Sequence, residues 1–272
     1  MKPLSGQGSR FSDLGLRLGS AVVLALGGAF VIWLGGPVFV LATAVVLALM
    51  LWEYVRMISG DRSIFNLPLL LSGLGGIAWV LLAGSGWTYV GLMCLVAGAL
   101  AAGLVAGRRF EWLAGGVLYL GIAAGTAVIL LNLPTQGMET VILLILVVIS
   151  ADVGAYFTGR SVGGKKLWPA VSPGKTWSGA FGGLAAAAVV GAVFAAAVGW
   201  SVPWAIVVSL LVAVGSQCGD LLESAVKRQS GVKDSSNVIP GHGGVLDRFD
   251  GILGGLLVYA VLHALGLGLV GQ

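Results

Sequence analysis

Long apolar runs separated by short polar loops dominate the chain. Runs of roughly 17–25 residues are long enough to cross a bilayer as a helix. Nine such spans are predicted, at residues 18–35, 37–53, 67–83, 87–106, 112–132, 139–158, 179–199, 203–226 and 251–270. The second run is short, and acids interrupt the eighth. Gly and Pro mark several joints, for example Gly35-Gly36-Pro37. The pattern predicts an all-α polytopic membrane protein with about nine transmembrane helices.

Composition supports a lipid environment. Hydrophobic residues make up 58% of the chain and charged residues 10%, whereas soluble domains have about 45–50% and about 25%. These values exclude a soluble globular enzyme and a disordered chain. Gly contributes 45 of 272 residues, which is typical of close helix packing in a bilayer and compatible with a homodimer. Cys94 and Cys218 both lie in apolar runs and indicate neither a disulfide framework nor a cysteine metal site.

The positions of the basic residues predict the topology. All 15 Lys and Arg residues lie in the N-terminal segment or in the loops after the second, fourth, sixth and eighth spans. By the positive-inside rule, the N-terminus is cytoplasmic and the C-terminus is outside. We interpret the first run as a retained span and not as a cleaved signal peptide. The net charge of +4 thus reflects membrane orientation, and no nucleic-acid partner is expected.

We expect one integral membrane domain over residues 1–272. Residues 1–135 form a helical scaffold, and residues 136–272 form the half that carries the chemistry, with cytoplasmic loops at 159–178 and 227–250. An acid in the scaffold half, Glu53, is flanked by Trp52 and Tyr54 and is interpreted as an anchor at the membrane interface.

Three acids lie within or at the ends of apolar spans. Asp152 is in the sixth span, and Asp220 and Glu223 are near the end of the eighth. Ionisable groups at such depth are costly and usually face a polar cavity. On a helix, Asp220, Glu223 and Lys227 share one face. Interhelical salt bridges or hydrogen bonds are the structural alternative.

The loop at residues 227–250 combines acids, cations and glycines. Its Pro-Gly-His-Gly-Gly run, residues 240–244, offers backbone N–H groups of the kind that cradle phosphate. Asp247 and Asp250 follow, and together with Asp220 they supply the oxygen ligands that Mg²⁺ prefers. Cations surround these acids. Acids and cations at one membrane mouth predict a metal-bound polyphosphate; the alternative is a solvated positive-inside loop with capping Asp residues.

The residues from Ser224 to Asp250 closely resemble the signature of the phosphatidate cytidylyltransferase (CDP-diacylglycerol synthase) family. Two upstream regions are also similar to the family: the first includes Asp152, Arg160 and the Ser172–Trp177 run, and the second includes Gly219, Asp220 and Glu223. The resemblance is close over residues 150–250, whereas the first hundred residues resemble the family only in their general apolar character. Ser178 stands where the family usually has Glu, which leaves the role of that carboxylate open.

The resemblance implies a reaction in which CTP and phosphatidate give CDP-diacylglycerol and pyrophosphate. It also implies Mg²⁺ as the cofactor, with two metal ions in the site and a monovalent ion as a possible third. The implied catalytic residues are Asp220, Lys227 and Asp247. The implied metal ligands are Asp220 and Asp247, with Asp250 and Glu223 as further candidates. The implied substrate-binding residues are Arg160, Lys165, Lys166, Ser172, Lys175, Thr176, Arg228, Lys233, His242, Gly243, Gly244 and Arg248.

Other functions remain open from the sequence. A transporter or channel would also bury acids, but it would not need crowded cationic loops on one side. A prenyl-phosphate or CDP-alcohol phosphotransferase would share Mg²⁺ and a lipid phosphate, and the latter's DG-x2-AR pattern is absent. A cytidylyltransferase for another lipid phosphate is the third alternative. The expected location is a bacterial inner membrane, with the active site facing the cytoplasm and membrane lipids around it.

Overall fold

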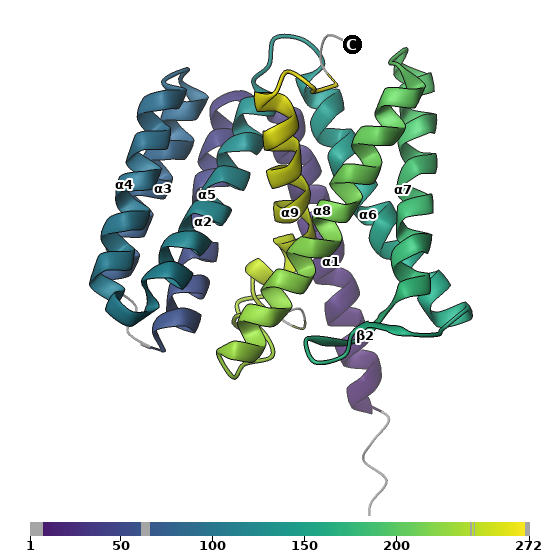
Figure 1. The fold of residues 1–272 in the computed structure, drawn as a ribbon, viewed down its shortest axis with the longest axis horizontal. Helices are drawn as coiled ribbons and strands as arrows, with labels where there is room; N and C mark the ends of the chain where they lie inside the picture. Colours follow the sequence, from purple (N-terminus) through teal and green to yellow (C-terminus); the bar gives the residue numbers. More distant parts are fainter. Residues whose placement is uncertain (1–7, 61–65, 240, 242, 270–272) are drawn as a thin grey trace, which may run out of the picture.

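The computed structural model describes residues 8–60, 66–239, 241 and 243–269, with side chains from residue 19 onwards. These residues form a bundle of α-helices with one small hairpin at one end (Figure 1). The helices are α1 (Gly8–Leu34), α2 (Gly36–Ser59), α3 (Leu67–Gly84), α4 (Thr88–Ala106), α5 (Phe110–Leu131), α6 (Gly137–Ser161), α7 (Trp177–Val198), α8 (Val202–Gln229) and α9 (Leu246–Ala264). The short 3₁₀ helix η1 (Gly107–Arg109) separates α4 from α5.

Each predicted apolar run overlaps one of these helices, and local sequence explains where several begin. Pro residues occupy the first turns of α2, α3 and α8, where the missing N–H breaks no intrahelical bond. The Asn66 side chain caps α3 by accepting a hydrogen bond from the Leu69 N–H at 2.9 Å. The helix positions therefore follow directly from the apolar runs and their flanking turn residues.

The molecule is a polytopic α-helical membrane protein. Six apolar helical segments among the described residues are long enough to cross a membrane, and one of them, Thr88–Leu131, contains both α4 and α5. Large apolar side chains such as Leu41, Leu104 and Val189 are exposed on the outside of the bundle. In water that surface would be costly, whereas in lipid it is not.

Close helix packing depends on glycine where α8 meets α9. A Cβ atom added to Gly219 would lie 2.6 Å from the Asp250 carbonyl oxygen and 2.9 Å from the Cα of Gly254. No larger residue fits there without moving a backbone, which agrees with the high glycine content. The contact brings the acid-bearing segment of α8 against the first turns of α9. In Figure 1 these two helices stand between the α3–α4 pair and the α6–α7 pair.

A short antiparallel hairpin departs from the all-α prediction. Strand β1 (Lys166–Trp168) pairs with β2 (Ser172–Thr176), with Lys166 opposite Thr176 and Trp168 opposite Ser172. The sequence predicted only a cytoplasmic loop here, because strands of three and five residues are too short to show an alternation of apolar and polar residues. The hairpin lies at the same end of the bundle as the α8–α9 loop (Figure 1). It therefore brings the basic residues after α6 to the end of α8.

Candidate functional site

The hairpin and α8 meet in an ion pair. The Lys175 Nζ atom at the end of β2 lies 2.6 Å from the Asp220 Oδ2 atom on α8, and the two side chains are 27% and 32% exposed. Asp220 also accepts a hydrogen bond from the Ser224 hydroxyl one turn later, at 3.4 Å. Both charged groups are therefore partly accessible to solvent.

A second ion-pair cluster lies one turn further along α8 and is more buried. The Lys227 Nζ atom lies 2.7 Å from the Asp247 Oδ1 atom and 3.3 Å from the Glu223 Oε1 atom. The side chains of Lys227, Asp247 and Glu223 are 13%, 4% and 7% exposed. The prediction that Glu223 and Lys227 share one helix face is confirmed, and the structure adds that Asp247 shares the same ammonium group.

Asp247 is fully engaged by protein donors. Its Oδ2 atom accepts hydrogen bonds from the Ser235 N–H at 2.9 Å, the Ser235 hydroxyl at 2.9 Å and the Gly244 N–H at 2.8 Å. Asp247 lies outside the predicted membrane span at residues 251–270, at the start of α9. Burial alone would raise the pKa of its carboxyl, but the Lys227 ammonium and the two backbone N–H groups outweigh burial and lower that pKa.

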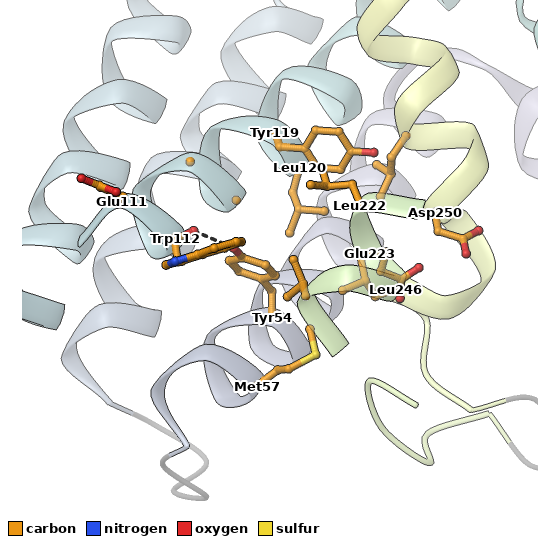
Figure 2. A pocket seen from close by; sticks show the side chains of 14 residues that line it. Tyr54, Met57, Glu111, Trp112, Tyr119, Leu120, Leu222, Glu223, Leu246 and Asp250 are labelled. Atoms are coloured by element: carbon orange, nitrogen blue, oxygen red, sulfur yellow. Dashed lines mark hydrogen bonds between the residues drawn. The ribbon is translucent and has the colours of Figure 1, made fainter. Parts of the chain in front are cut away.

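Glu223 and Asp250 line a pocket of about 240 Å³ between α2, α5, α8 and α9. Figure 2 shows their carboxyl groups at one end of this cavity and the rings of Tyr54, Trp112 and Tyr119 further along it. Apart from the ion pair with Lys227, neither oxygen of Glu223 accepts a hydrogen bond from the described residues, and the buried Tyr119 hydroxyl makes none with them. The cavity is thus mostly apolar, with the Glu223 and Asp250 carboxyl groups at its acidic end.

The acids of α6, α8 and α9 form one electrostatic group. Asp152 interacts with Asp220 and Asp250, and Asp250 interacts with Asp220 and Glu223. No three Asp, Glu, His or Cys side chains in the described ranges are placed to hold a metal ion together. Because Mg²⁺ usually keeps several waters and takes one or two carboxylates plus substrate phosphates, it does not need three.

The remaining predicted residues divide between the surface and the framework of the site. Six of the predicted substrate-binding cations are exposed: Arg160, Lys165, Lys166, Arg228, Lys233 and Arg248. Arg160 donates a hydrogen bond to the Tyr156 hydroxyl one turn earlier, at 2.9 Å. Ser172 is half-buried in β2. His242 lies outside the described residues.

Thr176, Gly243 and Gly244 shape the backbone of the two loops. The Thr176 hydroxyl is buried and caps α7 by accepting a hydrogen bond from the Gly179 N–H at 3.1 Å. Gly243 has a φ of +84° and pairs with Ile239 in an isolated bridge. The Gly244 N–H donates to Asp247, as described above, and is therefore not free to bind phosphate. Ser178 donates to the Gly163 carbonyl, which ties the end of α6 to the start of α7.

Comparison with known proteins places this arrangement in a family. The model of the cytidylyltransferase family matches residues 15–265. The phosphatidate cytidylyltransferase of Brucella suis biovar 1 (strain 1330) is 39% identical over 252 residues, which cover 89% of this chain and 90% of that protein. The chain belongs to the cytidylyltransferase family. It is therefore a membrane-embedded nucleotidyltransferase, as the resemblance of the Ser224–Asp250 run implied.

Other relatives match the family over part of the chain. The phosphatidate cytidylyltransferase of Bacillus subtilis (strain 168) is 41% identical over 138 residues, half of this chain and 51% of that protein. The phosphatidate cytidylyltransferase of Haemophilus influenzae (strain ATCC 51907 / DSM 11121 / KW20 / Rd) is 46% identical over 125 residues, 44% of this chain and 43% of that protein. Identity to the Brucella suis protein, by contrast, extends over most of both chains.

The role of one acid in the scaffold half was predicted wrongly from the sequence. Glu53 on α2 is only 1% exposed and accepts hydrogen bonds from the α8–α9 loop, so the interpretation as an interface anchor is wrong. The flanking Trp52 and Tyr54 are residue types typical of the aromatic belt at a membrane interface, and the interpretation was based on them. The sequence signal that favoured burial was an acid near the end of an apolar run, where an ionisable group usually faces a polar partner.

Proposed function

We propose that this chain transfers CMP from CTP to phosphatidate, giving CDP-diacylglycerol and pyrophosphate in phospholipid biosynthesis. The observation that carries the proposal is the alternation of cations and acids at one end of a membrane bundle, with Lys175 paired to Asp220 and Lys227 paired to Asp247. Such a site neutralises a triphosphate without excess charge of either sign. The names of the relatives from Brucella, Bacillus and Haemophilus support the same substrates.

The proposed reaction makes modest demands on acid–base chemistry. A phosphatidate phosphate oxygen is already anionic at neutral pH, so it attacks the α-phosphorus of CTP without a strong general base. A new P–O bond forms to the lipid phosphate as the bond from the α-phosphorus to the bridging oxygen breaks. That oxygen leaves on pyrophosphate. Catalysis then depends on positioning and on neutralising charge on the phosphates.

The cations divide by burial in this proposal. Lys227 is held by two buried carboxylates and offers a fixed positive charge, whereas Lys175 is accessible. Exposed Arg228 and Arg248 flank the same mouth, and these four cations neutralise the triphosphate and the leaving pyrophosphate. Arg160, Lys165 and Lys166 receive either the lipid phosphate or CTP. Arg, unlike Lys, can contact two phosphate oxygens at once.

The acids fit a hard divalent cation in their donor chemistry. Glu223 has buried oxygens that accept no hydrogen bond from the described residues apart from the ion pair with Lys227, Asp250 adjoins it at the same cavity, and Asp220 is accessible on α8. We propose that one or two of these carboxylates, together with water and the substrate phosphates, would hold Mg²⁺, which when bound supplies charge neutralisation on the phosphates. Asp247, the other proposed ligand, has both oxygens engaged by protein donors, so its stronger role is to orient Lys227.

The membrane arrangement in this proposal follows the charge pattern. With nine crossings, the positive-inside rule would put the N-terminus and the loops at residues 159–178 and 227–250 in the cytoplasm, where CTP is available, and the C-terminus outside. The acyl chains of phosphatidate stay in the bilayer. The bacterial origin of the relatives supports a bacterial inner membrane.

The test is turnover by the purified protein in detergent micelles with α-labelled CTP and Mg²⁺. With phosphatidate we expect a lipid-soluble labelled product and an equal amount of pyrophosphate. The control replaces phosphatidate with an undecaprenyl phosphate or with diacylglycerol. Labelled lipid from undecaprenyl phosphate alone would keep the reaction class and change the substrate. No labelled lipid from any acceptor, from protein that is well folded, would contradict the proposal.

A further inference from the structure

A buried acid of the N-terminal half reaches into the α8–α9 loop. Glu53, on α2, accepts four hydrogen bonds there. Its Oε1 atom accepts from the Val245 N–H at 2.9 Å and from the Ser236 hydroxyl at 2.6 Å. Its Oε2 atom accepts from the Leu246 N–H at 2.7 Å and from the Ser235 hydroxyl at 3.1 Å. Four donors compensate for burying this carboxylate.

The two backbone donors are the start of helix α9. Val245 precedes the first residue of α9, Leu246, and no side chain of the local sequence caps that end. Glu53 therefore acts as the cap from another helix, and its negative charge favours the positive end of the helix dipole. Gly244 leaves the space that this contact needs, because a Cβ atom there would lie 2.7 Å from the Glu53 Oε1 atom.

Ser235 links this cap to the ion-pair cluster. Its hydroxyl lies 3.1 Å from the Glu53 Oε2 atom and 2.9 Å from the Asp247 Oδ2 atom. The single hydroxyl proton serves one acceptor at a time, while the Ser235 N–H donates to Asp247 throughout. Asp247 in turn accepts from Lys227 at 2.7 Å. A continuous path of contacts thus runs from α2 to the ammonium group of Lys227.

We propose that Glu53 is a positioning residue of the nucleotidyl-transfer site. By fixing the start of α9 and the turn at Ser235, it sets the place of Asp247 and, through Asp247, of Lys227. The inference rests on the proposed function for its kinetic test only. It assigns a role in the site to the N-terminal half, which the sequence indicated as scaffold.

The test compares Glu53→Gln with wild type in the full chain. Gln keeps the shape but turns an NH₂ group toward two of the donors. We expect kcat per folded molecule to fall on the order of 10- to 100-fold, as for small displacements of reacting groups, with the KM for CTP and for phosphatidate within about threefold of wild type. Hydrogen exchange of peptides covering residues 235–247 should become faster, and that of α3 and α4 should not change.

Two control variants separate positioning from a general loss of stability. Glu139→Gln makes the same change at an exposed acid in the first turn of α6. Tyr259→Phe removes a buried hydrogen bond to the Leu269 N–H, of 3.0 Å, on α9 away from the loop. Both should keep wild-type kcat and slow exchange at residues 235–247. If Glu53→Gln folds poorly, Ser235→Ala removes the hydroxyl that joins Glu53 to Asp247 and should also lower kcat, though by less.

Two results would overturn the inference: unchanged exchange at residues 235–247 in Glu53→Gln, or faster exchange with unchanged kcat per folded molecule. The second would make Glu53 a structural tie without a part in turnover. If wild type forms no labelled lipid, the proposed function fails by itself. The exchange comparison, which needs no substrate, then decides whether Glu53 holds the Asp247 segment in place.

Discussion

The first prediction about stability concerns Lys227, whose ammonium group pairs with two buried carboxylates. It neutralises two carboxylates, Asp247 at 2.7 Å and Glu223 at 3.3 Å, whose side chains are 4% and 7% exposed. The variant Lys227→Met keeps the length and much of the volume of the side chain but removes the charge. It leaves both carboxylates buried without their cation, and burying an uncompensated charge is expensive.

The expected magnitude follows from burial. Removing one partner of a buried ion pair costs about 3–5 kcal/mol, whereas an exposed pair contributes about 0–1 kcal/mol. The matched control is Lys175→Met, which makes the same change at the same end of the bundle but in a pair whose members are 27% and 32% exposed. At about 2–4 °C per kcal/mol for a chain of this size, we expect Tm to fall by about 10 °C for Lys227→Met and by less than about 4 °C for Lys175→Met.

Thermal unfolding in detergent, followed by tryptophan fluorescence, measures this difference. The double variant Lys227→Met/Asp247→Asn should recover part of the lost stability, because it removes one of the two orphaned charges, and the two changes will not be additive. Equal Tm values for Lys227→Met and Lys175→Met would refute the reasoning. Loss of turnover in both variants is expected under the proposed function and does not depend on stability.

Two further predictions concern helix packing and topology. Gly219→Ala should destabilise the protein by about 1–3 kcal/mol and reduce turnover, because its Cβ atom would meet the Asp250 carbonyl oxygen at 2.6 Å. The control is Gly73→Ala, where an added Cβ atom meets nothing within 4 Å; it should leave turnover unchanged. Chemical denaturation measures the stability of the two variants, and equal stability of Gly219→Ala and Gly73→Ala would contradict the packing argument. Alkaline phosphatase, which is active only outside the cytoplasm, should be active when fused after residue 272 and inactive within residues 159–178; the reverse pattern would contradict the topology.

The sequence predicted the helices well because the length of an apolar run determines directly whether a helix can cross the bilayer. Each predicted run overlaps one observed helix. Within α8, the spacing of Glu223 and Lys227 predicted their shared face, and the structure confirms it with an ion pair. These are local relations, in which neighbours along a helix are neighbours in space.

Relations between distant segments were not readable in the same way. The Leu246 N–H donates a hydrogen bond to Glu53, which lies nearly 200 positions earlier in the chain. No local sequence pattern predicts a contact over that distance. The same holds for Asp247, which reads as a free carboxylate in sequence but has both oxygens engaged by Lys227, Ser235 and Gly244. The β1–β2 hairpin was missed because its strands are too short for a periodic signal.

The proposed function requires a metal-dependent cytidylyl transfer at the acids near the end of α8 and the start of α9. It is tested by Mg²⁺-dependent transfer of label from CTP to phosphatidate by wild type, Asp220→Asn and Asp247→Asn, each checked for folding. We expect lipid-soluble label from wild type with Mg²⁺, none with chelator, and loss of label in both variants. Label that persists in both well-folded variants would place the reacting groups elsewhere in the molecule and rule out this site.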